Sequence, residues 1–193
     1  MKKKSVPIEI SARHVHLSAP DRDILFGKDY ELKIAKKISQ PGQYAAEETI
    51  RIAGPKKTFE HVRIIGPVRP ATQVEISVTD GYWLGIKPQV ARSGVIEQSG
   101  GGISLVGPEG EIELQSGVIT AQRHLHISPM QAQAWGLKDL DVISICIPGV
   151  RGLVFHNVIV RSRAGIDELS FMLDTDEANA AGVSQGDVAE IVG

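Results

Sequence analysis

Short apolar runs separated by polar, glycine-rich turns make up most of the chain. β-branched residues gather in these runs, and 20 glycines and 10 prolines are scattered between them. Runs of this length, bounded by turn-forming residues, are typical of β-strands. The pattern predicts strands at residues 8–10, 31–34, 49–52, 62–65, 73–78, 103–105, 111–114, 142–147 and 158–161. We therefore expect a mainly β protein.

Three short segments carry helix signals. A Ser-Ala-Pro-Asp start predicts a helix through residues 23–26, which ends at Gly27. A Ser-Pro start predicts a second helix through residues 131–135, which ends at Gly136. A third short helix is predicted at residues 174–181. The helices are expected to be few and brief.

One eight-residue segment occurs twice. Residues 11–18 read Ser-Ala-Arg-His-Val-His-Leu-Ser, and residues 121–128 read Ala-Gln-Arg-His-Leu-His-Ile-Ser. Both copies have the form Arg-His-x-His-x-Ser and are followed by a predicted helix. In an extended strand, residues two apart point to the same face, so each histidine pair converges on one spot.

The similarity between the two halves extends beyond the histidines. Phe-Glu-His-Val at 59–62 corresponds to Phe-His-Asn-Val at 155–158, and Glu-Ile-Ser at 75–77 corresponds to Met-Leu-Asp at 172–174. We interpret this as an internal duplication that gives two similar small β-barrel domains facing each other. The predicted halves are residues 5–114 and 115–193.

The overall composition narrows the class of protein. The chain has 193 residues, 42% of them hydrophobic, and a formal net charge of −2, so we expect neither nucleic-acid nor membrane-surface binding. No apolar run approaches the roughly 20 residues of a membrane span. The single cysteine, Cys146, excludes an intramolecular disulfide and fits a reducing compartment. We expect a cytoplasmic protein.

His-x-His on a strand suits metal binding, because it presents two nitrogen ligands to one ion. The alternative for one pair is two partly buried, hydrogen-bonded histidines. Two copies that hold four of the six histidines favour metal. A stable site needs a third ligand, and Glu75, within an apolar strand, is the candidate in the first half. Taken alone, Glu75 would also fit a solvent-facing position. His61 and His156 lack a paired spacing and are interpreted as structural.

Arg69 is the candidate for anion binding. It lies in Gly-Pro-Val-Arg-Pro at residues 66–70, where two prolines and a glycine restrict the backbone. A rigidly held guanidinium beside a metal is suited to bidentate contact with phosphate. On local evidence, a surface arginine in a turn is an equal alternative.

Long motifs along most of the chain resemble the PduL-type phosphate acyltransferase (phosphate propanoyltransferase) family. They are the segments at residues 11–18, 40–48, 66–69, 72–75, 123–126 and 174–180. The resemblance implies an enzyme that exchanges a short acyl group between coenzyme A and inorganic phosphate. It also implies two β-barrel domains with an active site between them, and two zinc ions in that site.

The resemblance further implies roles for individual residues. His14, His16 and Glu75 would hold one zinc, and His124 and His126 would hold the other, nearest the coenzyme A sulfur.

Three further roles concern the substrates. By resemblance, Arg69 would bind phosphate and Ser93 would lie near coenzyme A. Tyr82 or Trp83, next to a glycine, could stack on the adenine of coenzyme A or belong to the core. Phosphate would attack the thioester carbonyl directly, without a covalent acyl-enzyme.

The chain departs from the family pattern at two places. Met172 stands where the family has a third histidine ligand, and a thioether is a poor ligand for zinc. We therefore expect the second zinc to be weak or absent, to take another ligand, or to bind only together with the coenzyme A thiol. The segment at residues 88–95 has shifted its arginine and lost an acid. The alternative function is therefore a catalytically reduced relative that binds phosphate, acyl phosphate or coenzyme A as a regulatory or scaffold module.

The resemblance also suggests partners and a location. An acyl kinase of the same pathway would use the acyl phosphate. The sequence leaves open whether the protein forms a homo-oligomer. Some relatives carry an N-terminal extension that directs them into bacterial microcompartments. This chain starts ten residues before its first motif, so that extension is either absent or has been removed.

Overall fold

The computed structural model describes residues 4–192 and divides them into two compact units. The first, called the barrel unit, comprises the described residues up to Ser11, Ser39–Pro41, and the chain from Gln122 onwards. The second, called the sheet unit, comprises Ala12–Ile38 and Gly42–Ala121. Each unit has its own hydrophobic core.

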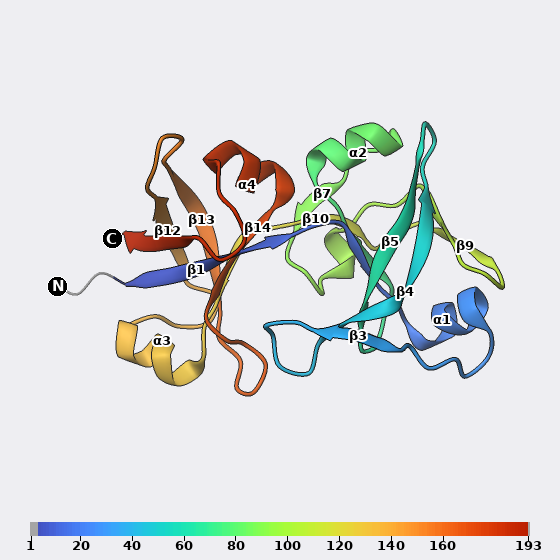
Figure 1. The fold of residues 1–193 in the computed structure, drawn as a ribbon, viewed down its shortest axis with the longest axis horizontal. Helices are drawn as coiled ribbons and strands as arrows, with labels where there is room; N and C mark the ends of the chain where they lie inside the picture. Colours follow the sequence, from blue (N-terminus) through green and yellow to red (C-terminus); the bar gives the residue numbers. More distant parts are fainter. Residues whose placement is uncertain (1–3, 193) are drawn as a thin grey trace. The chain divides into compact units, whose positions relative to one another are not determined.

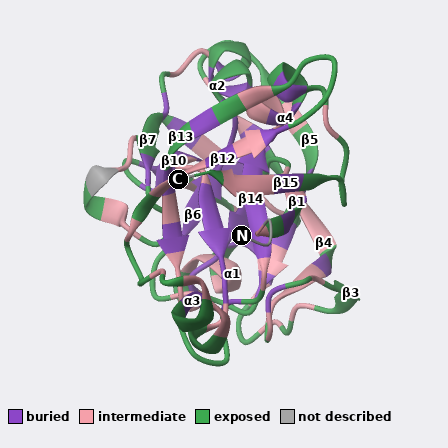
Figure 2. Cartoon of the chain, turned by 90° about the vertical axis from the view of Figure 1, so that its left-hand side faces the viewer, coloured by how far each residue is buried: buried purple, intermediate pink, exposed green. Residues whose placement is uncertain are grey.

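Six strands close into a barrel in the barrel unit. In order around the barrel they are β1 (Ser5–Ser11), β14 (Ser170–Asp174), β11 (His124–His126), β13 (Leu153–Arg161), β12 (Val142–Ile147) and β15 (Val188–Val192). β1 closes it, because it runs parallel to β14 on one side and antiparallel to β15 on the other (Figure 1). Alternate residues such as Val6 and Ile8 are fully buried inside, as expected for strands with one apolar face. Burial differs among the barrel strands: β14 is mostly buried, whereas β15 is mostly intermediate or exposed (Figure 2).

The described residues of the sheet unit form an open, mixed sheet of nine strands. Its order is β7 (Gln89–Ala91), β10 (Val118–Ala121), β6 (Gln73–Glu75), β2 (His14–His16), β5 (Thr58–Gly66), β4 (Tyr44–Ala53), β8 (Ile103–Val106) and β9 (Glu111–Leu114), with β3 (Ile34–Lys37) also paired to β4.

The prediction of two barrels is therefore confirmed for one unit and wrong for the other, although the mainly β class is confirmed. In the sheet unit, β8 gives its outer edge to β9, and β10 gives its outer edge to β7. Among the described residues, one isolated bridge joins the two ends of the sheet: it pairs Gly100, just before β8, with Val118 of β10. Because β9 and β7 pair with the outer sides of β8 and β10, the strands β8 and β10 do not pair with each other to close a barrel.

Within residues 4–192, four short α-helices follow strands, and a 3-10 helix spans Ile96–Gln98. The α-helices are α1 (Ala19–Phe26), α2 (Val78–Leu84), α3 (Pro129–Trp135) and α4 (Thr175–Ala181). Each begins after a residue whose side chain accepts a hydrogen bond from a backbone N–H of the first turn. α1, α3 and α4 confirm the three predicted helices. None of the described helices is long and apolar enough to span a membrane.

Two predicted strands differ from the structure. The strand predicted at 73–78 ends at Glu75, because Ser77 and Asp80 form a capping box that starts α2. The strand predicted at 31–34 is displaced, since β3 begins at Ile34 and runs to Lys37.

The two units repeat one arrangement of strands. His14 lies opposite Glu75 across β2 and β6, and His124 lies opposite Met172 across β11 and β14. The next pair of strands in each unit also contains a bulge. It lies between β4 and β5 in the sheet unit and between β12 and β13 in the barrel unit. At the bulges, His61 and Asn157 adopt left-handed conformations with φ of 54° and 57°. These matching features support the predicted duplication.

Each duplicated half contributes one strand to the sheet of the other half. β1 precedes the first histidine pair in the sequence but completes the barrel that contains the second pair. β10 precedes the second pair but lies beside β6 in the sheet that contains the first. The halves predicted from the repeat, 5–114 and 115–193, therefore group these two strands differently from the compact units.

Candidate metal sites and their surroundings

Three side chains converge on one point in the sheet unit. β2 presents His14 and His16 on the same face, and the adjacent antiparallel β6 places Glu75 opposite His14. The two Nε2 atoms lie 3.2 Å apart, and Glu75 oxygens lie 3.7 Å from His14 Nε2 and 3.9 Å from His16 Nε2. The ligand atoms of all three residues lie within 4.8 Å of one another. This cluster can hold a metal ion.

In both histidines, a hydrogen bond at Nδ1 leaves Nε2 as the acceptor atom. His14 Nδ1 lies 2.9 Å from the carbonyl oxygen of Ala12, and His16 Nδ1 lies 2.9 Å from that of Ile65. A carbonyl only accepts, so Nδ1 carries the proton in both neutral rings. Both Nε2 lone pairs therefore face each other and the Glu75 carboxylate, which is an arrangement that a cation satisfies.

His16 is held in the neutral form that binds metal. Burial is the largest cause that lowers the pKa of His16 well below its ordinary value, followed by the charges of His14 and Arg69. A neutral imidazole is the ligand form, so the site does not have to lose a proton from His16 near neutral pH.

Arg69 and Ser93 lie beside this cluster. The Ser93 hydroxyl donates to Glu75 Oε1 at 2.6 Å, and Arg69 donates from a guanidinium nitrogen to Ser93 Oγ at 3.4 Å. The backbone of Arg69 is fixed by its N–H bond to Leu17, at 2.8 Å. The Gln73 side chain also accepts from Gly94 N at 2.8 Å, which anchors the Ser93 segment. The structure thus brings together Arg69, Ser93 and the three metal-binding candidates.

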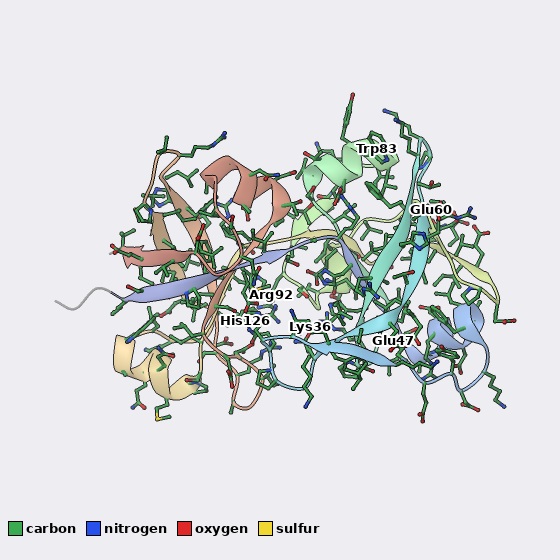
Figure 3. The ribbon with its side chains drawn as sticks, in the orientation of Figure 1. Lys36, Glu47, Glu60, Trp83, Arg92 and His126 are labelled. Carbon is green, nitrogen blue, oxygen red and sulfur yellow. The ribbon has the colours of Figure 1, made fainter. Side chains whose placement is uncertain are left out.

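The second histidine pair lies on β11 of the barrel unit, where Figure 3 labels His126. The Nε2 atoms of His124 and His126 lie 3.0 Å apart, and both residues are buried. His124 Nδ1 lies 2.8 Å from the carbonyl oxygen of Gln122, as in the first pair. Met172 occupies the position that Glu75 occupies in the sheet unit. Within the described residues, three histidine, cysteine or carboxylate donors converge only at the first pair.

Asp167 is a site neighbour that the sequence analysis missed. Its Oδ1 lies 2.6 Å from His126 Nδ1, and its side chain is fully buried. Burial acts to raise the pKa of Asp167, but hydrogen bonds from Arg163 and His126 outweigh it and lower the pKa below its ordinary value. The same ion pair raises the pKa of Arg163. Only the spacing of Arg163 and Asp167 by four residues hinted at this pair.

Tyr82 is placed on the surface of α2. The residue is 78% exposed, and Lys56 Nζ lies 5.3 Å from the ring centroid. The neighbouring Trp83, labelled in Figure 3, stacks on Phe59, and Lys57 Nζ lies 3.6 Å from its ring. The two aromatic residues therefore belong to an exposed cluster of rings and ammonium groups rather than to the core.

The chain is mainly β and contains the histidine pair twice. A carboxylate completes one pair, and an arginine with a fixed backbone lies beside it. These features define a class of protein that can bind a metal ion next to an anion. The family model for phosphate propanoyltransferase matches residues 7–184. The chain belongs to this family, and it is an acyltransferase.

Relatives in several bacteria support this assignment. The phosphate propanoyltransferase of Thermotoga maritima is 47% identical over 99% of this chain and 90% of that protein. That of Rhodobacter capsulatus is 46% identical over 92% and 82%, respectively. That of Salmonella typhimurium is 45% identical over 94% and 86%.

Proposed function

We propose that this acyltransferase exchanges a propanoyl or acetyl group between coenzyme A and inorganic phosphate, with an acyl phosphate as the product. The observation that carries the proposal is the position of Arg69 beside the cluster of His14, His16 and Glu75, to which Ser93 connects it. A metal cation and a guanidinium on neighbouring positions suit a phosphate dianion.

The donor atoms favour zinc at both histidine pairs. Two imidazoles and a carboxylate form a common catalytic zinc set that leaves a position open for substrate. His14, His16 and Glu75 would hold one zinc, and His124 and His126 would hold a second. When bound, zinc would act as a Lewis acid that polarises the thioester carbonyl and stabilises the departing thiolate.

The chain's own residues would orient phosphate for direct attack. Arg69 would bind two phosphate oxygens through its planar donors, and its contact with Ser93 would keep it aligned with Glu75. One phosphate oxygen would form a bond to the thioester carbon while the carbon–sulfur bond breaks, so coenzyme A leaves as a thiolate. Positioning and charge neutralisation would supply most of the rate enhancement.

We also propose that Tyr82 binds the adenine ring of coenzyme A. Its exposed ring offers a stacking face, and the adjacent Lys56 offers a positive charge for a phosphate of the nucleotide. Replacement of Tyr82 by Ala should raise the KM for coenzyme A and leave that for phosphate unaltered. An unchanged coenzyme A dependence would remove Tyr82 from the binding site.

The proposal is tested by propanoyl-coenzyme A phosphorolysis combined with zinc quantification. We expect thiol release that requires phosphate, and two zinc ions per chain. Glu75→Gln should lose the first zinc and most of the activity, because the third ligand loses its charge. Glu60→Gln, at an exposed position of β5, is the matched control. Phosphate-independent thiol release, or full activity after zinc removal, would contradict the proposal.

A further inference from the structure

We propose that Asp167 is a positioning residue for His126 and thereby sets the metal affinity of the second histidine pair. The inference rests on the proposed function, in which that pair holds zinc. Asp167 lies in the loop between β13 and β14, 41 residues from His126 in sequence.

Asp167 fixes the ring of His126 through a hydrogen bond to its outer nitrogen. The carboxylate accepts from Nδ1 at 2.6 Å, so the proton resides on Nδ1 and the Nε2 lone pair faces His124. A carboxylate behind a ligating histidine fixes the orientation of the ring and raises its basicity.

Arg163 holds the carboxylate in place. Its Nε donates to Asp167 Oδ2 at 2.9 Å, and its terminal nitrogen donates to Oδ1 at 2.9 Å. The Arg163 backbone N–H also donates to Oδ2, at 2.7 Å. With these bonds and His126, each oxygen of the buried carboxylate accepts two hydrogen bonds, so Asp167 has little freedom to turn away.

Among the described residues, no carboxylate bonds to Nδ1 of the corresponding ring of the sheet unit. There, His16 Nδ1 meets the backbone carbonyl of Ile65, and the negative charge comes from Glu75 inside the cluster. In the barrel unit, Met172 replaces Glu75 opposite the first histidine of the pair. Glu75 places its negative charge directly beside the first histidine pair. Asp167 instead acts on the second pair indirectly, through its hydrogen bond to His126.

The test compares Asp167→Asn with the wild-type full chain by two measurements. Nitrogen-15 NMR of the metal-free protein reports which nitrogen of His126 carries the proton, and the Nδ1–H signal should be altered or lost in the variant. Competition with a chromophoric chelator measures Zn²⁺ affinity at each pair. We expect the second pair to bind Zn²⁺ about 10- to 100-fold more weakly and the first pair to be unchanged.

Two further variants separate positioning from general damage. Asp187→Asn removes an exposed carboxylate that caps Ser184 N at 2.8 Å, outside this network, and should alter neither measurement. Arg163→Gln leaves Asp167 in place without its side-chain bonds and should weaken Zn²⁺ at the second pair to a smaller degree. It also provides the test if Asp167→Asn does not fold.

The two ideas fail in different ways. An unaltered His126 signal together with Zn²⁺ affinity within about twofold of wild type would overturn the role of Asp167. An equal loss of affinity at both pairs would also overturn it, because that is the result of general destabilisation. If wild-type protein binds no Zn²⁺ at the second pair, the second zinc of the proposed function and the effect of Asp167 on metal affinity both fail. The His126 signal then decides the positioning role on its own.

Discussion

At the scale of single residues, one opposing side chain distinguishes the two histidine pairs. Both pairs direct bare Nε2 atoms toward each other, 3.2 Å apart in the sheet unit and 3.0 Å apart in the barrel unit. Glu75 completes the first set with a charged oxygen, whereas Met172 offers the second a neutral sulfur. Since zinc prefers imidazole and carboxylate to thioether, the second pair should bind it more weakly.

Replacement of Met172 by His is therefore expected to strengthen zinc binding at the second pair and to raise acyl transfer. The new imidazole would lie opposite His124, as Glu75 lies opposite His14. Zinc content after dialysis and the phosphorolysis rate are the measurements. Met130→His, on the exposed face of α3, is the control for an added histidine. Unchanged zinc content would show that Met172 does not limit the site.

Replacement of Arg69 by Ala should raise the KM for phosphate by about 10- to 100-fold, because a charged hydrogen-bond donor contributes roughly 1.5–3 kcal/mol. The KM for propanoyl-coenzyme A should change little. Steady-state kinetics with phosphate as the varied substrate provide the measurement. Arg51→Ala, at an exposed position of β4, should behave as wild type. A phosphate KM that stays constant in Arg69→Ala would exclude phosphate binding by this residue.

The sequence predicts some site residues well because their geometry is local. The i, i+2 spacing of His14 and His16 suffices to place them together on a strand. Glu75 could be proposed from its polar character within an apolar strand, but its pairing with His14 requires the register of β2 and β6. The approach of Asp167 to His126 depends on how the loop before β14 folds. No spacing rule reports that contact.

At the scale of elements, the repeat predicts more than the helix signals did. α2 and α4 occupy corresponding places, each after the strand that faces a histidine pair. The third residue of each is acidic and contacts the arginine before the histidines: Asp80 contacts Arg13, and Glu177 contacts Arg123. The helix signals in the sequence predict α4 but not α2, although the Ser-Val-Thr-Asp start of α2 forms a capping box.

The start of α4 carries a prediction about pH. Burial is the main cause that raises the pKa of Glu177 from an ordinary 4.5 to about 7; Asp174 adds to it, and Arg123 opposes it. Among the described residues, the buried Glu177 Oε2 has no hydrogen-bond partner. The folded protein keeps this proton up to about pH 7, whereas the unfolded chain releases it near pH 4.5. Glu177 therefore lowers the free energy of unfolding as pH rises through that range.

Replacement of Glu177 by Gln should remove this pH dependence. The variant's free energy of unfolding, relative to wild type, should increase between pH 5 and pH 8, by at most about 3 kcal/mol. Urea unfolding at several pH values measures the difference. Glu111→Gln, at an exposed position of β9, is the control. Parallel curves for wild type and Glu177→Gln would show that the carboxyl titrates normally.

At the scale of the whole molecule, the exchange of β1 and β10 is the feature that the sequence could not reveal. A repeat shows that two segments are alike, but it does not show in which copy each strand pairs. The apolar pattern of β1 fits either sheet equally well. The difference between a closed barrel and an open sheet also depends on the edge strands β7 and β9, which have no counterpart in the repeat.

The strand exchange predicts how fragments behave. A fragment of residues 122–192 lacks β1 and should not unfold cooperatively, because β14 and β15 lose their shared partner. Residues 4–11 attached after residue 192 by a short turn should restore the barrel, since β1 and β15 are antiparallel and Ile191 N bonds to Lys4 O at 3.0 Å. Circular dichroism with thermal unfolding compares the two. A cooperative transition without residues 4–11 would contradict the prediction.

The place of β1 also has a consequence for how the protein is made. The ribosome synthesises β1 before its partners β14 and β15, and the whole sheet unit lies between them in the sequence. At about 5–20 residues per second, β1 waits roughly ten to thirty-five seconds for them. The strands that surround His14, His16 and Glu75 are all complete once β10 has been synthesised. The cluster of His14, His16 and Glu75 can therefore form on the nascent chain while β1, with its buried Val6 and Ile8, still lacks its partners β14 and β15 and could pair with other chains.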